Sequence, residues 1–159
     1  MEMCDVHDES GSRTGRIVAR GTELRQGEYY LVVHVWIRNE VGEYLVQQRA
    51  PNVLVYPGVW AATAGQVRAG EESIAAAIRE TMEEVGVQLS PANLRRFDRL
   101  KIENRFEDLW LAEVSRSEIG TPTMGPEVSA WRWASTADLR EAIKRGDFYA
   151  YSYFDSLPE

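Results

Sequence analysis

The sequence GQVRAGEESIAAAIRETMEEVGV spans residues 65–87 and determines the fold we expect. Within it, residues 73–85 are predicted to form a helix, because apolar side chains recur at helical spacing. Gly86 follows them and can adopt the left-handed conformation that commonly ends a helix. The apolar stripe, which should face a sheet, consists of Ile74, Ile78, Met82 and Val85.

The opposite face of this helix is acidic. Glu80, Glu83 and Glu84 lie three and four residues apart, so they share one face. Their mutual repulsion costs roughly a few tenths of a kcal/mol per pair, and Arg79 can offset only part of it. Such a face is either an ordinary solvated surface or a site for Mg²⁺ or Mn²⁺, because these ions prefer carboxylate oxygens.

The wider spacing favours the metal site. Gly65 is followed after five residues by Glu71, and after seven more by the run Arg79-Glu80-Thr81-Met82-Glu83-Glu84-Val85-Gly86-Val87. This segment resembles the motif G-x5-E-x7-R-E-U-x-E-E-x-G-U of the Nudix hydrolase family, in which U is a bulky aliphatic residue. A chance match of all the fixed residues is on the order of one in a million. The one departure is Thr81, which we interpret as tolerated core packing.

The resemblance implies an α+β fold, a Nudix-type α/β/α sandwich with a mixed β-sheet, formed by residues 1–159 as a single domain. It also implies that the helix glutamates bind Mg²⁺ or Mn²⁺. Glu80 and Glu84 would be the main ligands, and Glu83 would be a further ligand or would position water. The carbonyl of Ala64 would join the metal shell.

Other residues of the motif would support these ligands. By the same resemblance, Arg79 would orient the glutamates through a salt bridge. Gly65 would allow the backbone to approach the ion closely, and Glu71 would hold the loop. A glutamate would act as general base toward water. Some members of the family place an additional carboxylate where Glu127 lies, although Glu127 is equally well explained as an ordinary loop acid.

The rest of the chain predicts a mixed α/β organisation. Residues 5–20 suggest a hairpin, because the Asp8–Gly11 segment has turn residues and a strand pattern follows it. A second helix is expected at residues 136–145, and a short helical turn within 148–154. The remaining segments predict strands at residues 29–37, 44–49, 60–65, 94–103 and 106–114, and an edge strand at 131–133.

Residues that bind the substrate are less clear from the sequence. Arg49 ends a predicted strand and could contact phosphate or form a surface salt bridge, and Lys101 and Arg105 are weaker versions of this idea. Phe106, like Trp60 and Trp110, could stack on a base or belong to the core. His34 lies within an apolar strand, as a core or pocket-edge histidine.

Composition limits the classes of partner. The net charge is −7 and no block of Lys or Arg is present, which argues against a nucleic-acid polymer. No segment approaches the ~18 apolar residues of a membrane span. Cys4 is the single cysteine, so an internal disulfide is excluded. We therefore expect a cytoplasmic protein that binds a small-molecule diphosphate, with a homodimer as the family-based expectation.

Two other functions compete with hydrolysis. The stretches Gln47-Gln48-Arg49 and Pro57-Gly58-Val59-Trp60 resemble the isopentenyl-diphosphate isomerase branch of the same superfamily. Those isomerases use a cysteine just after the tryptophan segment, whereas residues 61–65 here read AATAG. A non-catalytic diphosphate sensor is the other alternative, but such proteins often lose motif glutamates and this chain keeps them all.

Overall fold

A seven-stranded mixed sheet forms the centre of the computed structural model, which describes residues 1–159. Its strands are β3 (Tyr30–Arg38), β4 (Tyr44–Arg49), β5 (Trp60–Ala61), β6 (Thr63–Gln66), β7 (Leu94–Ile102), β8 (Arg105–Glu113) and β9 (Val128–Ala134). The main order is β5-β4-β3-β8-β7, with β6 paired to β3 and β9 paired to β4. The β3–β8 pair is parallel and the other pairs are antiparallel, so the predicted mixed sheet is confirmed.

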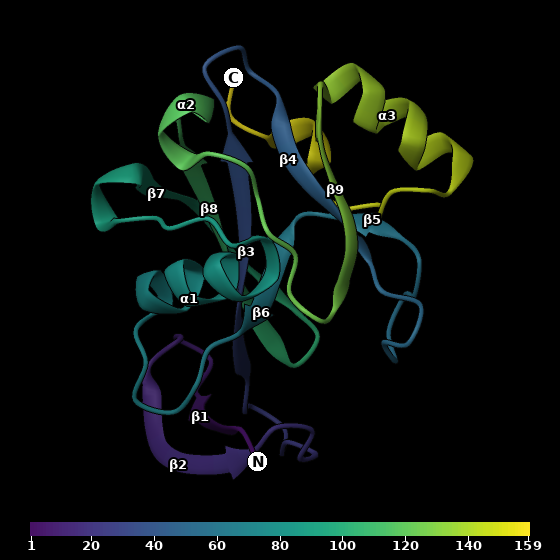
Figure 1. The fold of residues 1–159 in the computed structure, drawn as a ribbon. Helices are drawn as coiled ribbons and strands as arrows, with labels where there is room; N and C mark the ends of the chain where they lie inside the picture. Colours follow the sequence, from purple (N-terminus) through teal and green to yellow (C-terminus); the bar gives the residue numbers. More distant parts are fainter.

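Alternation along β3 creates the two faces of the sandwich, because successive side chains of a strand point to opposite sides. Leu31, Val33, Val35 and Ile37 pack into one hydrophobic core, together with Ala76 and Ala77 of the first helix. Trp36 packs into a second core on the other face. Figure 1 shows one helix in front of β3 and another at the upper right, beyond β9.

Helix α1 (Ser73–Val85) covers the first face and has the predicted bounds. Gly86 ends it with φ 67°, as expected. Thr81 is fully buried, which agrees with its interpretation as core packing. The predicted apolar stripe is wrong at Met82, which is 40% exposed. The stripe is displaced because the small side chains of Ala76 and Ala77 allow the helix to lie close to the sheet.

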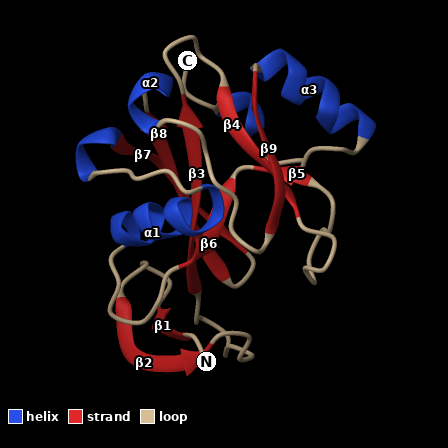
Figure 2. Ribbon diagram, in the orientation of Figure 1, coloured by secondary structure: helices blue, strands red, loops and turns tan.

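The second face is covered by helix α3 (Thr136–Arg145) and by the aromatic C-terminal segment. The side chain of Ser135 accepts a hydrogen bond from the Asp138 amide, which caps the helix start. The segment after α3 ends in the 3₁₀ helix η2 (Phe154–Ser156), near the helical turn predicted there. Figure 2 shows this segment and α3 together beside β4, β5 and β9.

An N-terminal hairpin of β1 (Met3–His7) and β2 (Arg13–Ala19) forms a separate small sheet. It lies at the opposite end of the molecule from the C-terminus, beside the loop that leads into α1 (Figure 1). Three hydrogen bonds fasten it to this loop. Ala69 N–H donates to the Met3 carbonyl (2.8 Å), Gly70 N–H donates to Asp5 Oδ2 (2.8 Å), and Arg13 donates to the Glu71 carbonyl (2.8 Å).

Some local features differ from the sequence expectation. The single strand expected at 60–65 is divided, because β5 pairs with β4 whereas β6 pairs with β3. The short helix α2 (Arg116–Ile119) and the 3₁₀ helix η1 (Pro91–Asn93) were not predicted. None of the helices is both long and apolar enough to cross a membrane.

Candidate active site

Arg79 is the centre of the charged network on α1. Its guanidinium donates to both carboxylate oxygens of Glu71 (2.8 and 2.9 Å) and to Glu80 Oε1 (2.8 Å). It also reaches Glu83 Oε2 (3.2 Å) and the carbonyl of Gln66 (3.1 Å). Since a guanidinium has five rigidly placed donors, one side chain fixes the loop and the helix carboxylates together. These contacts match the salt bridge expected for Arg79 and the loop-holding contact expected for Glu71.

Glu80 and Glu84 lie in a much drier environment than the sequence suggested. Glu84 is only 8% exposed, although helical spacing places it on the face opposite the apolar stripe. This burial follows from strand β4, whose buried Gln47 side chain covers Glu84 and donates to its Oε1. Burial raises the pKa of Glu84 well above its ordinary value, and the neighbouring Glu80 carboxylate raises it further. Burial also raises the pKa of Glu80, although Arg79 opposes this shift.

Gly65 makes room for Glu80. A Cβ atom at this position would lie 2.0 Å from Glu80 Cδ and 2.2 Å from its Oε1. Any other residue would therefore displace the carboxylate. Because Ala64 directly precedes this glycine, its backbone also lies beside Glu80 and Glu84.

The three helix glutamates of the motif line a cavity of about 310 Å³ that contains no hydrophobic residue. Glu83, whose side chain is 48% exposed, and Glu127 lie at this cavity. The complete lining is Glu2, Arg20, Glu80, Glu83, Glu84, Pro126 and Glu127. We refer to it below as the acidic cavity. The structure thus brings Glu127 together with all three helix glutamates, across the contact between α1 and the segment before β9.

The acidic cavity is chemically suited to a divalent cation. Five carboxylates and one guanidinium line it, so negative charge is in excess. The Glu80 and Glu84 carboxylates are close enough to interact directly, and two such groups need a proton or a cation between them. No three of the His, Cys, Asp or Glu side chains converge tightly enough to enclose an ion. Glu80 and Glu84 are a pair of hard oxygen donors that interact directly, and Glu83 and Glu127 line the same cavity.

A second cavity, also of about 310 Å³, lies beside the first on the sheet face that Trp36 occupies. Arginine and tyrosine side chains line it, together with Ala64 and Gly65 at the start of the motif. We call it the substrate cavity. Its lining is Arg20, Val32, His34, Arg49, Val55, Tyr56, Ala61, Ala62, Ala64, Gly65, Gln66, Arg105, Glu107, Tyr149 and Tyr151.

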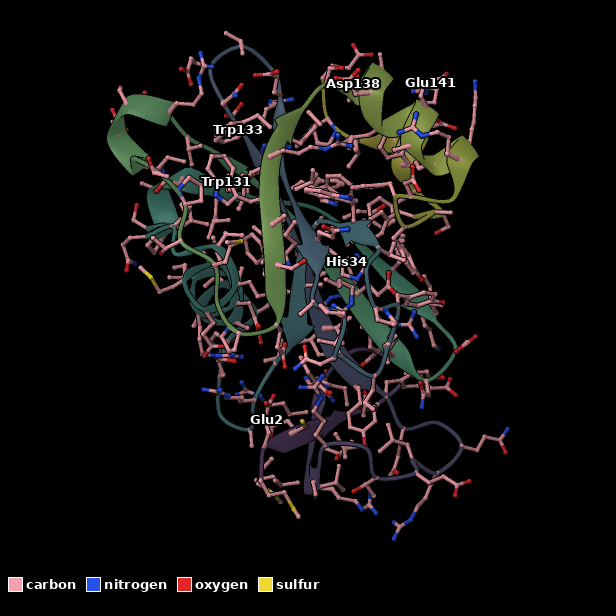
Figure 3. The ribbon with its side chains drawn as sticks, turned by 45° about the vertical axis from the view of Figure 1, so that its right-hand side comes forward. Glu2, His34, Trp131, Trp133, Asp138 and Glu141 are labelled. Atoms are coloured by element: carbon pink, nitrogen blue, oxygen red, sulfur yellow. The ribbon has the colours of Figure 1, made fainter.

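His34 lines the substrate cavity and lies near the middle of the sheet (Figure 3). Trp36 Nε1 can only donate, and it donates to the Tyr153 hydroxyl (3.0 Å), which in turn lies 2.6 Å from His34 Nδ1. The Tyr153 hydroxyl thus connects the Trp36 and His34 side chains. Burial lowers the pKa of His34 to about 4, so the ring is neutral at physiological pH. His34 is thus a neutral pocket-edge histidine.

Only some of the residues suggested for substrate binding line the substrate cavity. Arg49 and Arg105 line the substrate cavity, as does Ala64. Phe106 does not: it is 6% exposed and packs against Tyr29 in the core, so the expected substrate contact is corrected. Lys101 lies 4.5 Å from the centre of the Tyr29 ring rather than in the cavity. Phe106 is in the core because the parallel pairing with β3 turns it toward α1.

Several residues that line the two cavities, or contact the glutamates there, were not identified from the sequence. Gln47 lies in a stretch that had been noted only for its isomerase-like pattern. Tyr56, Tyr149 and Tyr151 come from a loop and the C-terminal segment, and no spacing signal relates these segments to the motif. Arg20 follows the N-terminal hairpin and had no assigned role. Only tertiary contacts bring these residues together.

A larger cavity, of about 590 Å³, lies around Arg38, Tyr44 and Pro158. It shares no residue with the acidic or the substrate cavity. Its size alone does not make it the active site, because chemistry requires convergent functional groups.

Comparisons with known proteins agree with the geometry. A family model described as NUDIX domain matches residues 28–155. An uncharacterised Nudix hydrolase of Listeria monocytogenes is 31% identical over 158 residues, which cover 99% of this chain and 94% of that protein. An isopentenyl-diphosphate Delta-isomerase of Paenarthrobacter aurescens is 28% identical over 152 residues, covering 90% and 81% of the two chains. The solved structure of DR0079 from Deinococcus radiodurans has a TM-score of 0.77 and 21% identity, covers 98% of this chain and 96% of that chain, and therefore shares its fold.

Proposed function

Because this chain belongs to the Nudix family and is a Nudix pyrophosphohydrolase, we propose that it cleaves the diphosphate linkage of a small organic diphosphate, such as a nucleoside diphosphate derivative. One observation carries this proposal above all. The acidic cavity, lined by the three helix glutamates of the motif, adjoins a substrate cavity that contains three arginines and three tyrosines. The first cavity suits a cation and the second suits an anion attached to a larger group.

Members of the family use divalent cations, and Mg²⁺ or Mn²⁺ is the cofactor proposed here. Glu80 and Glu84 would hold the ion with the Ala64 carbonyl, and Glu83 would be a further ligand or would position water. When bound, the ion would neutralise the diphosphate oxygens and lower the pKa of water. Arg79 would keep Glu80 and Glu83 in place through the hydrogen bonds described above.

The proton of the attacking water needs an acceptor. Glu83 and Glu127 are the candidates, because both line the acidic cavity without being buried. The water oxygen would form a new bond to phosphorus while the bridging P–O bond breaks. Its proton would pass to the carboxylate, and the leaving phosphate would take the bonding electron pair.

Arg49 and Arg105 are the side chains we propose for binding the anionic part of the substrate. Both line the substrate cavity, and guanidinium groups match phosphate geometry with paired donors. Tyr56 and Tyr149 line the same cavity and could contact an attached base or other ring.

Isomerisation of an isoprenoid diphosphate is the second candidate, because an isomerase is among the relatives. That reaction requires an acid and a base on opposite sides of an alkene. Residues 61–65 offer no cysteine, and Cys4 is 1% exposed within β1 and lines neither cavity. These observations favour hydrolysis over isomerisation.

A panel of diphosphates tests the proposal directly. It should include nucleoside diphosphates, nucleoside diphosphate sugars, dinucleotides, oxidised nucleotides and isoprenoid diphosphates, each with Mg²⁺ or Mn²⁺. Release of phosphate or of a monophosphate from at least one member is the expected result. A sensor without catalytic activity would bind one of these compounds without turnover.

A further inference from the structure

The N-terminal hairpin lies outside the segment that the family model matches, which begins at residue 28. Even so, two residues at its open end, Glu2 and Arg20, line the acidic cavity. Arg20 also lines the substrate cavity, and it is the one residue common to the two. Arg20 therefore lies where the two cavities meet.

We propose that Arg20 binds a phosphate group of the substrate where the two cavities meet, so that the N-terminal hairpin completes the active site. This inference rests on the proposed function, because it requires a diphosphate that reaches from the glutamates into the substrate cavity. The group that Arg20 would bind is a phosphate oxygen of a diphosphate. Other oxygens of the same diphosphate would face the acidic cavity. Arginine suits this role because its planar donors can bind two oxygens at once.

The backbone of Arg20 is held by the hairpin, whereas its side chain has only one long ion pair, with Glu2. The Arg20 amide donates to the Glu2 carbonyl (2.9 Å), next to the Met3–Ala19 pair of the hairpin. The hairpin itself is fastened to the motif loop at Ala69, Gly70 and Glu71, as described above. The position of residue 20 is therefore coupled to the loop that precedes α1. Figure 3 shows Glu2 on the side of the hairpin that faces the sheet.

Of the three arginines that line the substrate cavity, Arg20 has the weakest contacts with the rest of the protein. Arg105 donates to the buried Glu107 (2.8 Å), and Arg49 Nε donates to the Val55 carbonyl (2.7 Å). Arg20 makes no side-chain hydrogen bond, and its nearest acidic partner, Glu2 Oε2, is 3.7 Å away. Its side chain is 59% exposed, so its donors can turn to a ligand with the loss of only this long ion pair.

Binding of methylenediphosphonate, a diphosphate analogue that cannot be hydrolysed, is the direct test. Calorimetry with Mg²⁺ would compare the unmodified protein with Arg20→Gln, Arg20→Lys and the control Arg25→Gln. Arg25 belongs to the same segment, its side chain is 73% exposed, and it lines neither cavity. The same variants are assayed for kcat and KM on the best-cleaved member of the diphosphate panel.

Arg20→Gln should weaken binding roughly tenfold or more, as expected for the loss of hydrogen bonds to a charged group. KM should rise in parallel, Arg20→Lys should be intermediate, and Arg25→Gln should resemble the unmodified protein. Melting temperatures should change little, because the only contact removed is the long, largely exposed ion pair with Glu2.

Three results would overturn the inference: unchanged binding in Arg20→Gln, equal weakening in Arg25→Gln, or no binding of the analogue by the unmodified protein. Arg20-dependent binding without turnover of any panel member would instead contradict only the proposed hydrolysis.

Discussion

Glu84 is the residue whose surroundings distinguish this site most clearly from an ordinary acidic surface. Its Oε1 accepts from the Gln47 amide, and the Gln47 carbonyl oxygen in turn accepts from the Thr63 hydroxyl (3.1 Å). All three side chains are buried. Because both ends of the Gln47 amide are engaged, the amide cannot flip, and it holds the Glu84 carboxylate in one orientation.

Replacement of Glu84 by Gln should separate catalysis from folding. The substitution removes one charge of the proposed metal site, so kcat should fall at least about a hundredfold, the scale for loss of an electrostatic stabiliser. The metal-free protein should melt no lower than the parent, because burial already disfavours the Glu84 carboxylate. Steady-state kinetics and circular dichroism melting measure the two effects.

Glu72→Gln is the matched control, since this glutamate precedes α1, its side chain is 77% exposed, and it lines neither cavity. It should keep full activity. Near-normal turnover by Glu84→Gln, or its failure to fold, would contradict the role assigned to Glu84.

At this scale, sequence reasoning identified the side chains but not their environment. Helical spacing places Glu80, Glu83 and Glu84 on one face, which is a local property of the chain. Whether that face meets water depends on what packs against it. Gln47 is 37 residues away and reaches Glu84 only through the tertiary fold, so the burial of Glu84 could not be predicted.

At the scale of elements, the start of α1 is tied to the sheet by a buried carboxylate. Asp108 of β8 is fully buried and accepts from the Ser73 hydroxyl (2.6 Å) and from Arg99 of β7 (2.5 and 2.9 Å). Trp110 Nε1 donates to the same Ser73 hydroxyl (3.0 Å). Burial raises the pKa of Asp108, but the hydrogen bonds from Arg99 and Ser73 outweigh it and hold this pKa below its ordinary value. One residue thus connects α1, β8 and β7.

Asp108→Asn should therefore destabilise the protein by about 3 kcal/mol, because it leaves Arg99 without its buried partner. The parent should also lose stability as pH falls below the ordinary Asp range, since the unfolded chain then binds a proton that the folded chain resists. The variant should lack this part of the pH dependence. Urea denaturation at several pH values measures both effects. An Asp108→Asn variant as stable as the parent would contradict the stabilising role assigned to Asp108.

Prediction of elements succeeded where the signal was local. The bounds of α1 and α3 follow from periodicity together with Gly86 and the Ser135 cap, all within one segment. The division of residues 60–66 into β5 and β6 could not be predicted, because it depends on which strand lies on each side.

At the scale of the whole molecule, the acidic cavity joins α1, the segment before β9 and the N-terminal hairpin. A cation bound among these parts should stabilise the folded state, since the unfolded chain offers no such site. Mg²⁺ or Mn²⁺ at about a hundred times its dissociation constant would add about 2.7 kcal/mol.

The expected result is a melting temperature that rises and saturates with metal concentration. The double variant Glu80→Gln/Glu84→Gln should lose this rise while remaining folded. Calorimetric titration should give the same saturation point. If millimolar metal neither binds nor shifts the melting temperature, the proposed metal site is contradicted.

The choice between hydrolysis and isomerisation also concerns the whole molecule. Similarity over the whole chain includes an isomerase, whereas the residues of the site indicate a hydrolase. The isomerase relative covers most of the chain, whereas the residues around the acidic cavity are those of the hydrolase motif. Cys4 is buried in β1, opposite Val18, because the hairpin is fastened to the rest of the fold.

We predict that the protein releases phosphate or a monophosphate from at least one member of the diphosphate panel and does not interconvert isopentenyl and dimethylallyl diphosphate. Cys4→Ala should keep the same turnover, because its thiol reaches neither cavity. Its melting temperature should fall modestly, since a buried side chain is shortened. Product analysis by phosphorus NMR distinguishes the two reactions. Metal-dependent isomerisation without any hydrolysis, or loss of turnover in a folded Cys4→Ala variant, would overturn the assignment.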